Sequence, residues 1–197
     1  MDRPALALVM TGGQTPIRAY FEILHSPADL SAWLSARPGA PGGLTAGPQD
    51  LAAAVGLREA LFTTIRLRTL GQPHRPGDLQ VINAVGARAP LTPAIDPVTG
   101  QLAWSPASVP AALSTIARDG IELLTGDLAG RVRECANPRC ELVFLDTSPP
   151  GARRWCAMGR CGNRAKNEQY RRRGRLGLPS VHGSPVEQLP EHGTVPS

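Results

Sequence analysis

Apolar residues recur at helical spacing over much of the first 124 residues, and this pattern predicts a mostly helical N-terminal part. A helix start is indicated at Ser26, because this serine can cap a helix that has proline at its first position and Asp29 in its first turn. Leu30, Trp33 and Leu34 then fall on one face, which we expect to be buried.

The same spacing predicts three further helices, over residues 48–70, 77–88 and 109–124. On the first of these, we expect Arg58 and its neighbours Arg66 and Arg68 to face solvent or to pair with acidic residues such as Glu59. A buried stripe of apolar residues should occupy the opposite side of each helix.

Shorter elements are indicated at three other places. Residues 6–10 favour a short apolar strand or turn, and residues 17–24 a helical piece with Tyr20 and Phe21 on its apolar face. Residues 91–95 and 101–104 flank the turn sequence DPVTG, which is typical of a β-hairpin. The prediction for residues 1–128 is therefore a mainly α domain with a small β-hairpin.

All four cysteines lie within 27 residues of each other, as Cys135, Cys140, Cys156 and Cys161. Their spacing, C-x4-C-x15-C-x4-C, gives two close pairs, and zinc accepts four thiolates from such pairs. Two disulfides would need an oxidising compartment, and unrelated buried thiols would be scattered along the chain. We therefore predict one structural Zn²⁺ ion held by these four residues.

The residues between and after the cysteines predict a small metal-stabilised fold over residues 129–176. Asn137-Pro138 favours a metal-binding turn, residues 141–145 a strand, and residues 153–155 the strand that returns to pair with it. Residues 162–173 follow the last cysteine and predict a helix. This order indicates a small α+β, treble-clef-like or zinc-ribbon-like finger, in which the metal supplies folding free energy.

Residues beside the cysteines form four longer motifs, CANPRC at 135–140, FLDTS at 144–148, RRWCAM at 153–158 and CGNRAK at 161–166. Together these motifs resemble the CGNR zinc-finger family over some 40 continuous residues. In that family the finger follows a helical domain called ABATE. The resemblance implies a zinc-ribbon-like nucleic-acid-binding protein that acts as a stress-induced transcriptional regulator.

Charge is concentrated on the predicted finger. The whole chain is +5, but residues 131–175 hold twelve basic and four acidic residues, which gives +8 there and −3 elsewhere. A local positive field of this size is typical of a protein that binds polyphosphates. Apolar runs are too short to span a membrane, and reduced cysteines without an export signal favour the cytoplasm. Residues 177–197 are proline-rich and predict a disordered tail.

We therefore expect a zinc-dependent nucleic-acid-binding protein, with a DNA-binding transcriptional regulator as the leading hypothesis. Arginine suits phosphate because its fork is planar and permanently charged. The candidate contact residues are Arg153, Arg154, Arg160, Asn163, Arg164, Lys166, Arg171, Arg172, Arg173 and Arg175. Asn163 could instead cap the helix or bond a cysteine sulfur.

Two other functions remain open on the sequence. The basic surface could bind RNA, although aromatic residues make up only 4% of the chain, which disfavours base stacking. It could also bind an acidic protein partner. No catalytic group of residues is evident, and a four-thiolate zinc leaves no open position for water, so we do not expect an enzyme. The N-terminal domain is a candidate for homodimer formation or for binding a small-molecule effector, and its short connection to the finger predicts that the two parts pack together.

Overall fold

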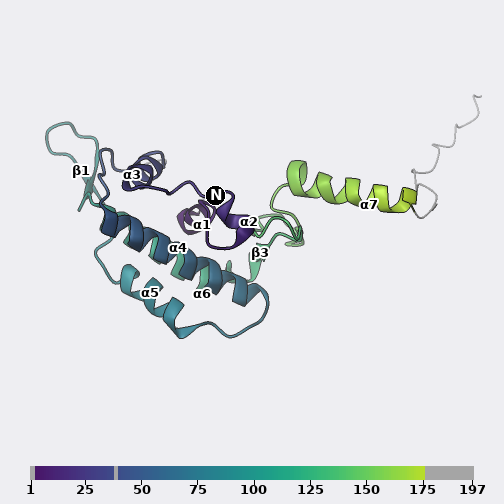
Figure 1. The fold of residues 1–197 in the computed structure, drawn as a ribbon. Helices are drawn as coiled ribbons and strands as arrows, with labels where there is room; N and C mark the ends of the chain where they lie inside the picture. The colour runs from purple at the N-terminus through teal and green to yellow at the C-terminus, as the bar shows by residue number, and fades with distance from the viewer. Residues whose placement is uncertain (1–2, 38–39, 176–197) are drawn as a thin grey trace, which may run out of the picture.

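Two long helices lie side by side and run in the same direction at the centre of the computed structural model, which describes residues 3–37 and 40–175 (Figure 1). The helices of the N-terminal part are α1 (Pro4–Val9), α2 (Pro16–Ala19), α3 (Pro27–Ser35), α4 (Pro48–Thr69), α5 (Pro76–Gly86) and α6 (Val109–Thr125). Each of them has proline in its first turn, where the missing backbone N–H costs no hydrogen bond. The proline content of the chain therefore marks helix starts in this part.

The core of the N-terminal part is formed where α1, α4, α5 and α6 meet. Leu57, Leu61 and Ile65 of α4 are fully buried, and Leu113 and Ala117 of α6 lie in the same apolar cluster. The predicted helices at 48–70, 77–88 and 109–124 are confirmed to within two residues at each end. Ser26 and Asp29 form the expected capping box at the start of α3. None of the described helices combines the length and apolar character needed to cross a membrane.

The β-hairpin predicted near residues 91–104 is confirmed. Strands β1 (Thr92–Ile95) and β2 (Leu102–Ser105) pair antiparallel, with Thr92 opposite Ser105. Most of the hairpin is exposed, and it projects from one end of the helical part (Figure 1).

The prediction of a strand or turn at residues 6–10 is wrong, because this segment belongs to the buried helix α1. The carboxylate of Asp119 on α6 accepts a 2.8 Å hydrogen bond from the backbone N–H of Ala5, and Arg3 pairs with the same carboxylate at 2.9 Å. A carboxylate at this position satisfies one of the free N–H groups at the helix start. That partner is 114 residues away in sequence, so the local pattern does not reveal it.

The side chain of Arg58 is buried, and it follows the second of the two predicted alternatives by pairing with acidic residues. Its guanidinium donates to both carboxylate oxygens of Glu22, at 2.8 and 2.7 Å, and to Glu59 at 3.0 Å. Arg18 pairs with the other oxygen of Glu59 at 2.8 Å. These two buried arginines and two partly buried glutamates form an ion-pair network, which anchors the segment between α1 and α3 to α4.

The double glycine after α1 lies against this network. Gly12 and Gly13 have φ angles of +142° and +151°, which disfavour any other residue. A Cβ on Gly13 would lie only 2.1 Å from the guanidinium carbon of Arg18. The glycines are therefore required by close packing around the arginine.

The C-terminal part contains η1 (Ala129–Arg131), β3 (Val132–Glu134), β4 (Val143–Leu145), the π-helical turn η2 (Met158–Gly162) and α7 (Asn163–Arg175). A mainly helical N-terminal part followed by a small α+β finger confirms the predicted fold class. One detail is wrong, because β4 pairs with β3, with Arg133 opposite Phe144, and not with residues 153–155. The helix expected after the last cysteine is confirmed as α7, which extends away from the helical part (Figure 1). The predicted tail, residues 177–197, lies outside the described residues.

Candidate metal centre and basic surface

The four cysteines converge from four separate positions of the finger. Cys135 follows β3, Cys140 precedes β4, Cys156 lies before η2 and Cys161 lies within η2. Their four Sγ atoms all lie within 4.8 Å of one another. No cysteine is in a disulfide. The predicted ligands thus form a single cluster of free thiols.

The spacing of the sulfurs fits a tetrahedral metal ion. The Sγ atoms of Cys140 and Cys156 are 3.6 Å apart, and those of Cys156 and Cys161 are 3.7 Å apart. Four sulfurs at a Zn–S distance of about 2.3 Å stand about 3.8 Å apart along each edge of a tetrahedron. An all-thiolate donor set also suits zinc rather than hard cations. The cluster is therefore one metal site with the geometry and chemistry that a structural zinc ion requires.

Burial makes two of these thiols, those of Cys140 and Cys156, poor candidates for free charged groups. Cys135, Cys140 and Cys161 are buried, and burial raises the pKa of the Cys140 thiol well above its ordinary value. Burial likewise raises the pKa of Cys156. Adjacent buried thiolates repel each other unless a cation lies between them. A metal ion at the centre of the cluster would supply that charge.

Groups around the cysteines hold the finger in shape. The N–H of Cys135 donates to the carbonyl of Leu142 at 2.8 Å, and Asn137, which is buried, accepts at its Oδ1 from the N–H of Arg139 at 3.0 Å. Asn137 also lies within hydrogen-bonding reach of the Cys161 sulfur. A sulfur contact of this kind was one role expected for Asn163, but its side chain donates to the carbonyl of Gly159 at 3.4 Å.

Asp146 closes the loop between the two cysteine pairs, a role that the sequence did not indicate beyond turn formation. Its buried carboxylate accepts from the hydroxyl of Ser148 at 2.6 Å and from the N–H of Arg153 at 2.7 Å. These hydrogen bonds, led by that from Ser148, lower the pKa of Asp146 to about 2. The carboxylate is therefore ionised and directed into the finger.

The finger packs against the helical part as expected from the short connection. Val132 and Val143 belong to the main apolar core, and β3 and β4 contact α4. Arg66 of α4 lies between two acidic residues of the finger, at 3.5 Å from Glu134 and 3.8 Å from Glu141. The hydroxyl of Thr15 also donates to Glu141. Two acidic side chains of the finger are thereby directed toward the helical part.

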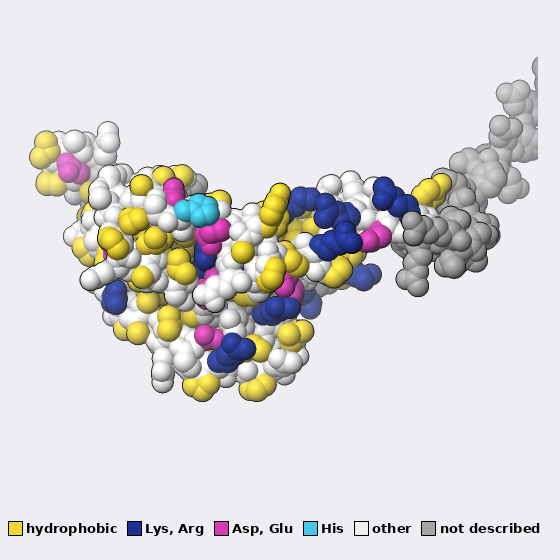
Figure 2. Space-filling view, in the orientation of Figure 1, with side chains coloured by type: hydrophobic (Ala, Val, Ile, Leu, Met, Phe, Trp, Pro, Cys, Tyr) yellow, Lys and Arg dark blue, Asp and Glu magenta, His cyan; other side chains and the backbone are white. Residues whose placement is uncertain are grey.

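The predicted contact residues whose side chains are described are exposed. They are Arg153, Arg154, Arg160, Asn163, Arg164, Lys166 and Arg171. Lys and Arg side chains gather over the finger and the first turns of α7 in the space-filling view (Figure 2). Arg172, Arg173 and Arg175 lie on α7, but their side chains fall outside the part that the structure describes.

Three of these arginines also have partners within the finger. Arg153 donates to the carbonyl of Cys156 at 2.6 Å and lies over the ring of Phe144. Arg154 stacks on Trp155, with 5.4 Å between the guanidinium carbon and the ring centre. Arg160 lies beside Cys156, and the hydrogen bond between them raises the pKa of the guanidinium. Phe144 and Trp155 belong to the small apolar cluster of the finger.

A groove of about 520 Å³ lies between the finger and the segment after α1, and no sequence motif predicted it. On the side of the helical part it is lined by Met10, Tyr20 and Phe21. The finger contributes Asn137, Arg139, Cys140, Leu142, Arg160, Cys161 and Arg164.

The two aromatic rings in this groove are exposed, and the helical piece predicted over residues 17–24 is shorter than expected. Helix α2 ends at Ala19, and Tyr20 and Phe21 are 85% and 49% exposed. Their rings meet edge to face at 5.1 Å. Adjacent exposed aromatic rings opposite Arg160 and Arg164 create a surface that could hold both an aromatic base and a phosphate.

The fold and the cysteine cluster define a helical domain joined to a four-cysteine zinc finger. Two family comparisons agree with this division. The ABATE family, described as "Putative stress-induced transcription regulator", matches residues 2–127, and the CGNR zinc finger matches residues 131–174. The chain therefore belongs to the ABATE family and carries a C-terminal CGNR zinc finger, as the sequence motifs indicated. A comparison with curated proteins finds no match.

Proposed function

We propose that this chain is a zinc-dependent nucleic-acid-binding protein, and specifically a DNA-binding transcriptional regulator. The observation that carries the proposal is the orientation of charge on the finger. Three of its four acidic residues are turned inward, Glu134 and Glu141 toward Arg66 and Asp146 into the loop of the finger. The outer face is left with exposed basic side chains, which suits a surface that neutralises phosphates.

In this proposal one Zn²⁺ ion is held by Cys135, Cys140, Cys156 and Cys161. The ion fixes the chain around η2 and so positions the start of α7. A site with four thiolates has no open position for water, which supports a structural role and not a catalytic one. One matched family is described as a regulator and the other as a zinc finger, and neither description names an enzyme. Free thiols also suit a reducing compartment, so we propose a cytoplasmic location.

Helix α7 supports duplex DNA as the partner. It has 13 residues, which correspond to a length of about 20 Å, and it extends away from the rest of the chain (Figure 1). A helix of this kind fits the major groove, which is about 12 Å wide. Arg164 and Lys166 are exposed in its first turn, and Asn163 stands at its start, where a side chain could reach a base edge.

The groove beside Tyr20 and Phe21 favours a second candidate, the binding of single-stranded RNA. Exposed aromatic rings stack on unpaired bases, while Arg160 and Arg164 would bind the adjoining phosphates. Duplex DNA cannot use these rings without base extrusion. The two candidates therefore differ in which residues they require.

Paired substitutions test the proposal. Arg160→Gln with Arg164→Gln should weaken binding to duplex DNA and reduce the slope of log K against log salt by about 1.8, since each phosphate contact contributes about 0.9. The control is Arg75→Gln with Arg88→Gln, which removes the same charge from exposed positions on the helical part. Equal losses in both variants would mean that net charge alone matters. Unchanged DNA binding in the finger variant, with loss of a protein partner, would favour a protein-docking role.

A further inference from the structure

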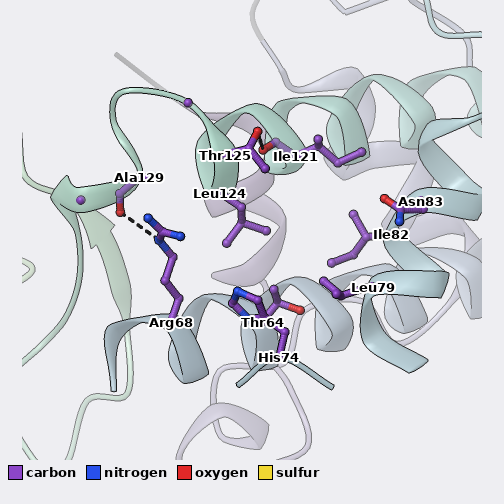
Figure 3. A pocket seen from close by; sticks show the side chains of 12 residues that line it. Thr64, Arg68, His74, Leu79, Ile82, Asn83, Ile121, Leu124, Thr125 and Ala129 are labelled. Atoms are coloured by element: carbon purple, nitrogen blue, oxygen red, sulfur yellow. Dashed lines mark hydrogen bonds between the residues drawn. The ribbon is translucent and has the colours of Figure 1, made fainter. Parts of the chain in front are cut away.

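A second cavity lies between α4, α5, α6 and the connection to the finger, away from the basic surface. Its volume is about 630 Å³, which is within the range of small-molecule sites. Its apolar lining comes mainly from Leu79 and Ile82 of α5 and from Ile121 and Leu124 of α6 (Figure 3). Gly126, Ala129 and Gly130 close the side next to the finger.

Two polar atoms at this cavity lack hydrogen-bond partners among the described residues. Thr64 is only 1% exposed, and its Oγ1 neither donates nor accepts a hydrogen bond. Nδ1 of His74, which lies just before α5, also has no hydrogen-bond partner among the described residues. Buried polar groups are nearly always paired because an unpaired one costs stability. These two unpaired groups on the lining of one cavity are candidates for hydrogen bonds to a ligand.

The charge of the cavity selects the kind of ligand. Arg68 lies one turn after Thr64 on α4, so both side chains are on the same face. Its Nε donates to the carbonyl of Ala129 at 3.3 Å, which leaves the terminal nitrogens of the fork for a second partner (Figure 3). The described residues that line the cavity include no aspartate or glutamate. A cationic fork beside an apolar surface matches a carboxylate with an apolar body.

We propose that this cavity is a binding site for a small organic carboxylate. The carboxylate bonds to Arg68 and accepts from Thr64, and the apolar part of the ligand packs against Leu79, Ile82 and Leu124. His74 provides a further hydrogen bond through Nδ1. This site is separate from the zinc cluster, and its existence does not depend on nucleic-acid binding by the finger.

The test uses the full-length zinc-loaded protein and three probes, benzoate, phenylacetate and hexanoate, each compared with its primary amide. At about ten times the dissociation constant, a bound carboxylate should raise the melting temperature by about 3–6 °C. The amides should have little effect because they lack the charge that Arg68 recognises. The inference is overturned by no saturable shift with any carboxylate, or by equal shifts with the amides.

Two variants and one control assign the effect to the cavity. Arg68→Gln should weaken carboxylate binding about 10- to 100-fold, since a hydrogen-bonded charge is lost. Arg88→Gln removes an exposed arginine outside the cavity and should bind as the unmodified chain does. Thr64→Val should weaken binding while leaving the melting temperature of the free protein unchanged or higher, because the removed hydroxyl has no partner. Unchanged affinity in both cavity variants would overturn the proposed site.

Discussion

The buried ion pair between Arg58 and Glu22 gives a quantitative prediction about stability. Arg58→Met keeps most of the packing of this side chain, which is only 2% exposed, but leaves the Glu22 carboxylate without its two hydrogen bonds of 2.8 and 2.7 Å. Removing one member of a buried pair costs about 3–5 kcal/mol. Glu22 keeps 20% of its side chain exposed, so we expect the low end, about 3 kcal/mol.

This loss corresponds to a fall in melting temperature of about 6–12 °C for a chain of this size. Urea unfolding followed by circular dichroism at constant zinc measures the free energy directly. Arg88→Met is the matched control, because Arg88 is exposed, and it should change stability by less than about 0.5 kcal/mol.

A double-mutant cycle separates the pair from other effects of losing Arg58. Glu22→Gln should cost less in the Arg58→Met background than in the unmodified chain, with a coupling of about 1–3 kcal/mol. Glu59 retains Arg18 in all four proteins and loses its 3.0 Å contact with Arg58 in both proteins that carry Arg58→Met, so this loss cancels in the cycle. A loss below about 1 kcal/mol for Arg58→Met, or a coupling near zero, would refute the reasoning that this network anchors the segment after α1.

Three further predictions concern the metal, the pH and the groove. Zinc chelation or Cys156→Ser should raise hydrogen exchange across residues 131–165. Helices α4 and α6 should stay protected, because the helical part has its own core. An equal loss of protection in α4 would contradict this prediction. Burial acts to raise the pKa of Glu22, but the hydrogen bonds and charge from Arg58 outweigh it and lower that pKa. The ionised carboxylate therefore contributes stability above its unfolded pKa of about 4.3, and this stability is lost as the pH falls through the lower folded pKa. The stability of Glu22→Gln, measured by urea unfolding, should lack this decrease at acid pH. An unchanged pH profile in this variant would show that Glu22 does not cause the decrease. Tyr20→Ala with Phe21→Ala should weaken single-stranded RNA binding by about 1–3 kcal/mol per stacked base and leave duplex DNA binding unchanged. Val98→Ala, an exposed control on the hairpin, should change neither affinity. Equal RNA affinity of the unmodified chain and both variants in anisotropy titrations would show that the groove does not bind RNA.

The features that the sequence predicted correctly depend on neighbours close in the chain. Ser26 and Asp29 cap a helix three residues apart, and the cysteine pairs are recognised by their short spacing and the residues beside them. The whole finger motif lies within some 40 residues, so its composition and order are visible without knowing the fold.

The features that were missed depend on partners far away in the chain. Asp119 caps α1 from α6, and Glu22 pairs with Arg58 from another segment, so neither side chain shows its role in the local pattern. Tyr20 and Phe21 were expected on the apolar face of a helix over residues 17–24, and apolar aromatic residues usually pack inward. Proline at residue 16 starts a helix that ends after four residues, and this early end leaves both rings exposed.

The most direct test of the central claim is the salt dependence of duplex DNA binding by the zinc-loaded chain. Anisotropy of a labelled duplex, titrated at several salt concentrations between about 50 and 300 mM, gives the slope of log K against log salt. The account predicts a slope steeper than about −4, equivalent to about five phosphate contacts, and loss of binding after zinc is removed. No binding at the lowest salt, or a slope near zero that zinc removal does not change, would contradict it.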